Sequence, residues 1–220
     1  MKKPGQLLEL RRREMVATLK RFGIANRRVL GAFLEVPRDL FFDGAALELA
    51  YRDGAYPIGF GQTISQPYTV ACMTSLLVER CVSGKVLEVG TGSGYQAAIL
   101  AVLGFSVFSV ERVVGLYERA GAVLGRLGLD VVCRCGDGSL GWVDEAPFDG
   151  VLVTAGAPGV PVSLLEQLGP GGCMVLPVGD CCSQKMTVIC RLGGGFGREV
   201  FEEFSFVPLV GKEGWDERVF

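Results

Sequence analysis

The feature that most constrains the fold is a short, mostly apolar run, Val86–Val89, that leads directly into the glycine-rich segment Gly90–Gly94. Residues 95–103 then follow a helical pattern. Glycine permits positive φ and, because it has no Cβ, lets the backbone approach a ligand closely. A strand that turns through glycines into a helix therefore predicts a parallel α/β sheet with a ligand at the carboxyl edge of that strand.

The chain beyond this segment alternates short apolar runs with helical patterns, which is typical of a parallel sheet with helical crossovers. We expect an α/β fold with a Rossmann-like, doubly wound and mostly parallel sheet. The predicted strands are residues 86–89, 106–110, 131–132, 151–153, 174–177, 186–190 and 199–207, and the predicted helices are residues 95–103, 114–127 and 162–168.

The N-terminal part of the chain predicts a helical cap. Apolar residues recur at helical spacing over residues 7–22, and Gly23 supplies a stop. A second short helix is expected to start at Asn26 and to end before Pro37.

Residues 51–66 are rich in glycine, proline and small polar residues, which predicts an ordered loop rather than a regular element. An amphipathic helix is expected after this loop. We expect one domain over residues 1–220, in which residues 1–80 form the helical cap and substrate loop and residues 81–220 form a cofactor-binding α/β core.

Composition excludes several classes of chemistry. The chain has 22 Lys and Arg against 24 Asp and Glu, a formal net charge of −2, and no block of like charge, which argues against a nucleic-acid partner. It contains no histidine, which removes the commonest general base and every His-ligated metal site. Any chemistry must therefore proceed without imidazole.

The eight cysteines show no Cys-x-x-Cys spacing. A zinc site would need Cys133 and Cys135 to meet the adjacent pair Cys181 and Cys182, so we expect buried apolar roles and no metal. The N-terminus lacks an uninterrupted apolar signal core, and the apolar stretch 97–110 is too short to cross a bilayer. We therefore expect a cytoplasmic protein without a membrane partner.

The glycine spacing distinguishes two classes of cofactor. A dinucleotide fingerprint has the spacing G-x-G-x-x-G, whereas here the spacing is G-x-G-x-G and Tyr95 stands at the last fingerprint position. The loop is similar to that of class I S-adenosylmethionine-dependent methyltransferases. Glu111, at the end of the second predicted strand, suits the ribose hydroxyls of either cofactor. Asp137, in the Gly-Asp-Gly segment after the third predicted strand, suits the adenine of the cofactor. The plain alternatives are that Glu111 is a solvent-facing cap and that Asp137 is a turn aspartate.

The sequence after the fourth predicted strand bears on the methyl acceptor. Residues 153–158 read Val-Thr-Ala-Gly-Ala-Pro and contain neither the Asn/Asp-Pro-Pro-aromatic motif of amino methyltransferases nor a Pro-Cys pair, which argues against a nucleobase. A carboxylate, with a pKa of about 3.5 to 4, is already an anion at neutral pH and needs no general base. A carboxylate acceptor therefore suits a chain without histidine.

Further motifs indicate a family. The chain contains Gly-Gln-Thr-Ile-Ser-Gln-Pro at 61–67, Leu-Glu-Val-Gly-Thr-Gly-Ser-Gly-Tyr at 87–95 and Phe-Val-Pro-Leu-Val at 206–210. In this combination and order it resembles the protein-L-isoaspartate O-methyltransferases, of the bacterial type, over nearly its whole length. The resemblance implies methyl transfer from S-adenosylmethionine to the free α-carboxylate of L-isoaspartyl residues in damaged proteins and peptides, with S-adenosylhomocysteine as product. The ester then closes to a succinimide.

The resemblance also implies roles for individual residues. Ser65 and Thr63 correspond to the active site, and Ser65, Val207 and Pro208 to the substrate groove. The cofactor-binding residues would be Gln62, Ile64, Glu88, Gly90, Thr91, Gly92, Ser93, Gly94, Tyr95, Glu111, Arg112, Asp137 and Gly138. A plain alternative is that Thr63 and Ser65 only cap the helix after Pro67.

Three other functions stay open at the level of sequence. One is a class I methyltransferase acting on a small molecule, which would keep the glycine loop and leave residues 63–67 incidental. Another is a module that binds cofactor or damaged chains without turnover, and a third is a nicotinamide dehydrogenase, against which the glycine spacing argues. We expect a monomer. Tyr68 and Val210 suit the bacterial-type pattern.

Overall fold

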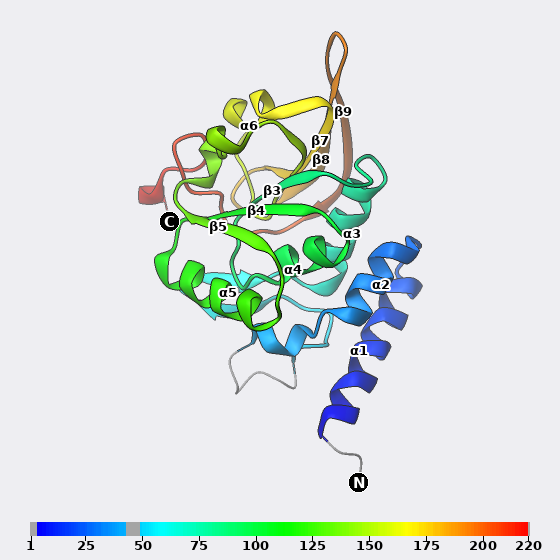
Figure 1. Ribbon diagram of the computed structural model, residues 1–220. Coiled ribbons are helices and arrows are strands. Elements are labelled where there is room, and N and C mark those ends of the chain that lie inside the picture. The colour runs from blue at the N-terminus through cyan, green and yellow to red at the C-terminus, as the bar shows by residue number, and fades with distance from the viewer. Residues whose placement is uncertain (1–3, 43–48, 220) are drawn as a thin grey trace.

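A computed structural model describes residues 4–42 and 49–219 (Figure 1). The ends of the predicted domain, residues 1–3 and 220, and residues 43–48 of its cap lie outside the described residues. Within the described part of the chain no helix is long and apolar enough to cross a membrane.

The predicted N-terminal helices are both present, as α1 (Pro4–Arg21) and α2 (Arg27–Glu35), and a 3-10 turn follows at Arg38–Phe41. The Asn26 side chain caps α2 by accepting hydrogen bonds from the amides of Arg28, at 3.0 Å, and Val29, at 3.3 Å. This cap satisfies two amides that have no partner within the helix.

Seven strands form one sheet in the order β5-β4-β3-β6-β7-β8-β9. The strands β3 to β7 run parallel, and β8 and β9 are added antiparallel. The strands are β3 (Lys85–Val89), β4 (Ser106–Glu111), β5 (Val131–Cys135), β6 (Phe148–Val153), β7 (Leu168–Gly179), β8 (Gln184–Leu192) and β9 (Gly195–Phe204). The helices are α3 (Pro67–Val78), α4 (Tyr95–Val102), α5 (Val114–Arg126) and α6 (Val162–Glu166). The predicted α/β class is confirmed.

Two apolar clusters cover the two faces of the sheet. One joins the cap, α3, α4 and α5 and contains Leu19, Phe33 and Ile99, all 0% exposed. The other lies under α6 and contains Leu164 and Phe148. Figure 1 shows the same arrangement, with the cap, α3, α4 and α5 on one side of the sheet and α6 on the other.

Several predicted boundaries are wrong, among them those of three strands. The strand expected at 174–177 extends over Leu168–Gly179, where β7 pairs with both β6 and β8. The strand expected at 131–132 reaches Cys135 in register with Glu111. The last strand ends at Phe204, because the amide of Phe206 donates to the side chain of Gln184 instead of to a neighbouring strand.

The expectation of a loop over residues 51–66 is also corrected. Residues Tyr56–Gly59 form β1 and Gln62–Ile64 form β2, an antiparallel hairpin with Tyr56 opposite Ile64. The turn between the strands is made by three consecutive residues with positive φ, Gly59, Phe60 and Gly61. This β1–β2 hairpin rests on α5, where Arg119 donates to the carbonyl of Ile58.

The helix expected to be amphipathic, α3, is buried on most of its surface. It lies between the cap helices α1 and α2 on one side and strands β6 and β7 on the other. A helix packed on two sides needs apolar residues around most of its circumference.

Candidate functional site

The glycine loop connects β3 to α4 as predicted. Gly90, Gly92 and Gly94 all have positive φ, at 95°, 54° and 89°. A Cβ on Gly90 would stand 2.5 Å from Thr154 Oγ1, and one on Gly138, across the same cavity, would stand 2.6 Å from Val89 Cγ1. Backbone thus forms this part of the cavity wall because no side chain fits there.

The Glu111 carboxylate lies beside the loop at the end of β4 and is 5% exposed. One oxygen accepts the amide of Gly92 at 2.8 Å, and the other accepts the amide of Val113 at 2.9 Å. Each carboxylate oxygen has two lone pairs, so the contacts fix the side chain and leave capacity to accept further hydroxyl groups. Its place at the carboxyl edge of β4 agrees with the predicted ribose contact.

Two cavities meet at the glycine loop and share Thr63, Gly90, Gly92 and Thr154. We call them the Glu111 cavity and the Ser65 cavity. The Glu111 cavity is lined by Gln62, Thr63, Val89, Gly90, Gly92, Val110, Glu111, Arg112, Gly138, Thr154, Ala155 and Val207–Val210. The Ser65 cavity is lined by Thr63, Ile64, Ser65, Val70, Met73, Gly90–Ser93, Tyr95, Gln96 and Thr154. Fourteen predicted site residues therefore occupy one continuous region.

The β1–β2 hairpin brings Ser65 to this region, and Ser65 does not cap α3. Gln66 is the N-cap residue of α3 and makes no side-chain capping hydrogen bond. The amide of Tyr68 instead donates to Asp53 Oδ1 at 2.8 Å. Within residues 4–42 and 49–219 no protein group hydrogen-bonds the Ser65 hydroxyl. The capping alternative for Thr63 and Ser65 is thus wrong, and the Ser65 hydroxyl is available to a ligand.

The segment after β9 closes the opposite wall. The amide of Gly156 donates to the Val207 carbonyl at 2.8 Å, and the amide of Leu209 donates back to the Gly156 carbonyl at 2.8 Å. These bonds hold Val207 and Pro208 beside the end of β6, in the Glu111 cavity. Val210 lines the same cavity, whereas Tyr68 packs against Phe204 and donates to Glu202 at 3.0 Å.

Three predicted cofactor residues lie off the two cavity walls. Gly94 begins α4, where a Cβ would meet Ala120 at 3.3 Å. Asp137 lies in an adjacent groove and is engaged by protein: Oδ1 accepts the Ser139 amide at 2.9 Å, and Oδ2 accepts the Lys212 amide at 2.8 Å. Arg112 lines that groove and the Glu111 cavity together, so Asp137 stays close to the site.

Glu88, the third, lies behind the loop and is 0% exposed. It accepts a short hydrogen bond from Ser109, whose hydroxyl lies 2.5 Å from that of Thr91 in the glycine loop. Burial raises the pKa of Glu88 to about 8, so the carboxyl is mostly neutral at pH 7. Glu88 therefore supports the loop through Ser109 and Thr91.

Thr154 and Gln96 belong to the site and were not expected. Thr154 Oγ1 donates to the Gly90 carbonyl at 2.6 Å, which ties the end of β6 to the glycine loop. Gln96 is 6% exposed, and its amide group donates to Thr74 at 3.1 Å. The position of Thr154 directly after the apolar run of β6 is a signal that could have identified it, since ligands bind at the carboxyl ends of parallel strands. Gln96, in the first turn of a buried helix, gives no such signal.

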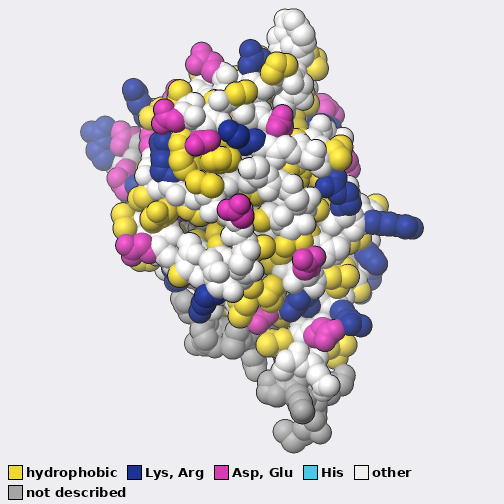
Figure 2. Space-filling view, in the orientation of Figure 1, with side chains coloured by type: hydrophobic (Ala, Val, Ile, Leu, Met, Phe, Trp, Pro, Cys, Tyr) yellow, Lys and Arg dark blue, Asp and Glu magenta, His cyan; other side chains and the backbone are white. Residues whose placement is uncertain are grey.

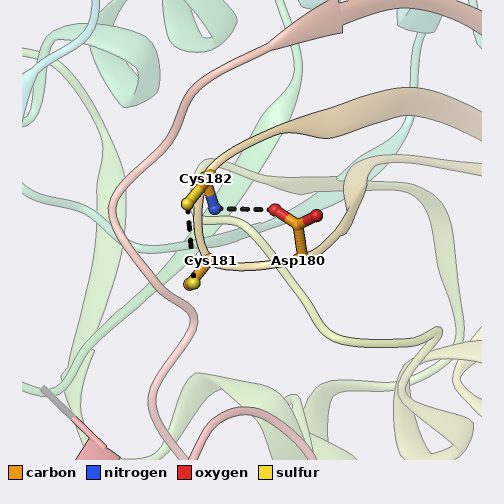
Figure 3. A group of neighbouring side chains, drawn as sticks. All are labelled: Asp180, Cys181 and Cys182. Atoms are coloured by element: carbon orange, nitrogen blue, oxygen red, sulfur yellow. Dashed lines mark hydrogen bonds between the residues drawn. The ribbon is translucent and has the colours of Figure 1, made fainter.

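The cysteines do not form the four-cysteine arrangement considered above. Cys133 and Cys135 lie on β5, and Cys181 and Cys182 lie in the turn after β7, with β4, β3 and β6 between them. In that turn the two sulfur atoms are 3.7 Å apart and exposed, and Asp180 accepts the Cys182 amide at 2.8 Å (Figure 3). On the face shown in Figure 2, Lys and Arg side chains are interspersed with Asp and Glu.

Known proteins are similar to almost the whole chain. The family model of protein-L-isoaspartate(D-aspartate) O-methyltransferase matches residues 10–214. The protein-L-isoaspartate O-methyltransferase of Pelodictyon phaeoclathratiforme is 69% identical over 220 residues, 100% of both chains. That of Chlorobaculum tepidum is 64% identical over 204 residues, 93% of this chain and 96% of the other.

Solved structures agree with the sequence relatives. A protein-L-isoaspartate O-methyltransferase structure superposes with a TM-score of 0.83 at 29% identity, covering 92% of this chain and 67% of that one. A Plasmodium falciparum structure in complex with S-adenosyl-L-homocysteine shares the fold, with a TM-score of 0.79 at 24% identity over 90% of this chain and 97% of that one. With the glycine loop, Glu111 and Ser65 placed around one pair of cavities, the chain belongs to the protein-L-isoaspartate(D-aspartate) O-methyltransferase family.

Proposed function

We propose that this chain transfers a methyl group from S-adenosylmethionine to the free α-carboxylate of L-isoaspartyl residues in damaged proteins and peptides, and so starts their repair through a succinimide. The observation that carries the proposal is the position of Ser65. Its hydroxyl makes no hydrogen bond to the described protein and lies in a cavity whose other wall is the glycine loop. An acceptor held at Ser65 would therefore lie beside the cofactor loop.

The residues of the Glu111 cavity fit the cofactor. At Gly90 and Gly138 the cavity wall is bare backbone, because a Cβ would collide with Thr154 or Val89, and the Glu111 carboxylate keeps free lone pairs for ribose hydroxyls. Gln62 and Arg112 line the same cavity. When bound, S-adenosylmethionine supplies an activated methyl group and leaves as S-adenosylhomocysteine.

The acceptor site has to orient an anion and has no proton to remove. The isoaspartyl α-carboxylate is ionised at neutral pH, so one of its oxygens forms the new O–CH3 bond while the S–CH3 bond breaks and its electron pair stays on sulfur. The Ser65 hydroxyl can donate a hydrogen bond to the other oxygen. Because the acceptor is already ionised and only has to be oriented, a chain without histidine can catalyse the transfer, since alignment supplies much of the rate.

The walls of the site suggest how flexible peptides are held. Val207 and Pro208 line the cavity beside Thr63 and belong to a segment held by backbone hydrogen bonds to Gly156. We infer that this segment and the hairpin contact the peptide backbone, whereas the glycine loop and Glu111 hold the cofactor. The names of the high-identity relatives support isoaspartyl proteins over a small-molecule acceptor.

The proposal extends to the oligomeric state, the compartment and the partners of the enzyme. We infer a monomer that acts in the cytoplasm on damaged proteins. The mixed surface charge supports a protein without a nucleic-acid partner, since such partners need clustered Lys and Arg.

Replacing Ser65 tests the acceptor site. Ser65→Ala should lower kcat/KM for an isoaspartyl peptide by roughly 10- to 100-fold, the value of a hydrogen bond to a charged group, and leave the Kd for S-adenosylmethionine within about twofold. Calorimetry and a methyl-transfer assay measure the two quantities. Ser75→Ala is the matched control, because Ser75 lies on α3 and bonds only the Ala71 carbonyl, at 2.7 Å. An equal loss of cofactor affinity in Ser65→Ala would contradict the assignment.

A further inference from the structure

Arg38 is a buried cation beneath the acceptor site. Its side chain is 0% exposed, although it stands in the 3-10 turn that follows the cap helices. Within residues 4–42 and 49–219 no carboxylate forms an ion pair with it. A buried charge without a counter-ion is costly, and arginine is rarely buried unless paired.

The guanidinium contacts the segment before the hairpin and both sides of the site. Nε donates to the Ala50 carbonyl at 2.8 Å, and Nη2 donates to the Ser65 carbonyl at 2.9 Å. The group also lies over the Tyr95 ring, 4.6 Å from its centroid. Ser65 is the acceptor-site residue and Tyr95 directly follows the glycine loop, so one side chain spans both halves of the active site.

The arrangement satisfies Arg38 only in part. Nη1 and the Tyr95 hydroxyl are both buried, and neither makes a hydrogen bond of ordinary geometry among the described residues, although the two side chains interact electrostatically. Burial lowers the pKa of Arg38 to about 10, so the group stays positive at neutral pH. A residue selected only to fill space between cap and core would be apolar, since an unsatisfied buried charge lowers stability.

We propose that Arg38 is a positioning residue for the acceptor carboxylate. Its hydrogen bond to the Ser65 carbonyl fixes the backbone that carries the Ser65 hydroxyl, and its ring contact fixes the distance of that backbone from the glycine loop. The inference rests on the proposed function, because it takes the carboxylate at Ser65 as given.

The test is a double-mutant cycle between Arg38→Met and Ser65→Ala in the full chain. The assay uses an isoaspartyl peptide, and calorimetry gives the Kd for S-adenosylmethionine. If Arg38 acts through Ser65, Arg38→Met lowers kcat/KM by roughly 10- to 100-fold in the parent chain. In the Ser65→Ala background the same replacement should lower it by less than about threefold, because coupled residues are not additive. The cofactor Kd should change by less than about twofold in either background.

A conservative variant and a control variant complete the double-mutant cycle. Arg38→Lys retains the charge and can donate to one carbonyl, so it should recover part of the lost kcat/KM, and it replaces Arg38→Met in the cycle if that chain does not fold. Arg12→Met is the matched control, because Arg12 also donates to two backbone carbonyls in the cap, those of Leu34 and Glu35, and touches neither Ser65 nor Tyr95. It should leave kcat/KM unchanged.

The outcomes separate this inference from the proposed function. An equal loss in both Ser65 backgrounds, or a parallel loss of cofactor affinity, would overturn the role of Arg38 while the parent chain still methylates the peptide. A parent chain that binds cofactor and leaves the isoaspartyl peptide unmethylated would overturn the proposed function and the inference with it.

Discussion

Each glycine of the loop is required for a different structural reason. At Gly90 a Cβ would collide with the Thr154 hydroxyl, whereas at Gly94 it would press on Ala120 and Leu124 of α5. At Gly92 it would approach Ile58 of the hairpin only to 3.6 Å, and the requirement there is the positive φ of 54°. The first position thus shapes the ligand cavity and the third packs a helix.

Gly90→Ala should therefore remove cofactor binding. The new Cβ would stand 2.5 Å from Thr154 Oγ1 at a φ of 95°, a combination that we expect to cost about 1 to 3 kcal/mol of folding stability and to narrow the Glu111 cavity. Calorimetric titration with S-adenosylmethionine checks the first effect and urea unfolding the second.

A second glycine serves as the control for this change. Gly121 lies inside α5, and a Cβ there would meet nothing within 4 Å, so Gly121→Ala should raise the free energy of unfolding by up to about 1 kcal/mol. Undiminished cofactor affinity in Gly90→Ala would contradict the role given to the loop.

Glu88 should give the enzyme a measurable pH dependence of stability. Its pKa is raised from 4.5 to about 8 by burial, so between these values the folded chain keeps a proton that the unfolded chain has lost. The free energy of unfolding should then fall as pH rises through this window, by up to about 1.4 kcal/mol per pH unit from this group. Urea unfolding between about pH 5 and pH 8 measures the slope.

Glu88→Gln isolates the contribution of this carboxyl. The amide keeps the shape and can still accept the hydrogen bond from Ser109, but it does not titrate. The slope in this variant should be smaller than in the parent chain. Equal slopes in the two chains would show that Glu88 is ionised in the folded state.

The positions of the acidic residues relative to the strands could be predicted from the sequence, but their hydrogen-bond partners could not. Glu111 has the place that its sequence position predicts, beside Gly92 at the edge of β4. Glu88 lies in β3 and Asp137 follows β5, as expected, yet Glu88 Oε2 accepts from Ser109 and both oxygens of Asp137 accept from protein groups. Sequence position fixes which strand end a side chain leaves from, whereas its hydrogen-bond partners come from residues distant in the chain, such as Lys212.

At the scale of elements, the β1–β2 hairpin could not be predicted because its amino-acid composition is that of a loop. Its strands have only four and three residues, and its turn has two glycines, so the segment has the composition of a loop. Tertiary contacts stabilise it, since Arg119 of α5 holds the Ile58 carbonyl and the Phe60 ring lies over Gly115. Short strands that depend on another element leave little periodicity to detect.

Asp53 links the segment before the hairpin to α3, and its removal should destabilise the protein. Asp53→Ala leaves the Tyr68 amide without its 2.8 Å partner and should lower the free energy of unfolding by about 0.5 to 2 kcal/mol. Asp53→Asn is the matched control, because asparagine caps helices equally well. Thermal unfolding of both variants decides the point, and equal destabilisation in both would contradict the capping role of Asp53.

At the scale of the whole molecule, the sheet was predictable because its central strands are buried on both faces. Continuous apolar runs such as Val151–Val153 stand out in the sequence. The position of the cap was not predictable, since an amphipathic helix does not specify which surface covers it. In the structure the apolar cluster that contains Leu19 of α1 continues to Ile99 of α4, so the cap and the core share one interior.

This shared interior has a consequence for function. The cap supplies Arg38, the hairpin supplies Ser65 and the core supplies the glycine loop, and the three meet through the contacts of one guanidinium. We therefore expect residues from all three parts to align an acceptor carboxylate with the cofactor, since alignment supplies much of the rate.

The most direct test is methyl transfer from labelled S-adenosylmethionine to two peptides that differ only in an L-isoaspartyl or an L-aspartyl linkage. In the proposed site Ser65 orients a free α-carboxylate beside the cofactor loop and the segment Val207–Pro208 contacts the peptide, so we predict labelling of the isoaspartyl peptide and little of its aspartyl twin. The label should then be lost as methanol while a succinimide forms. Equal labelling of both peptides, or labelling of neither by a chain that binds the cofactor, would contradict the account.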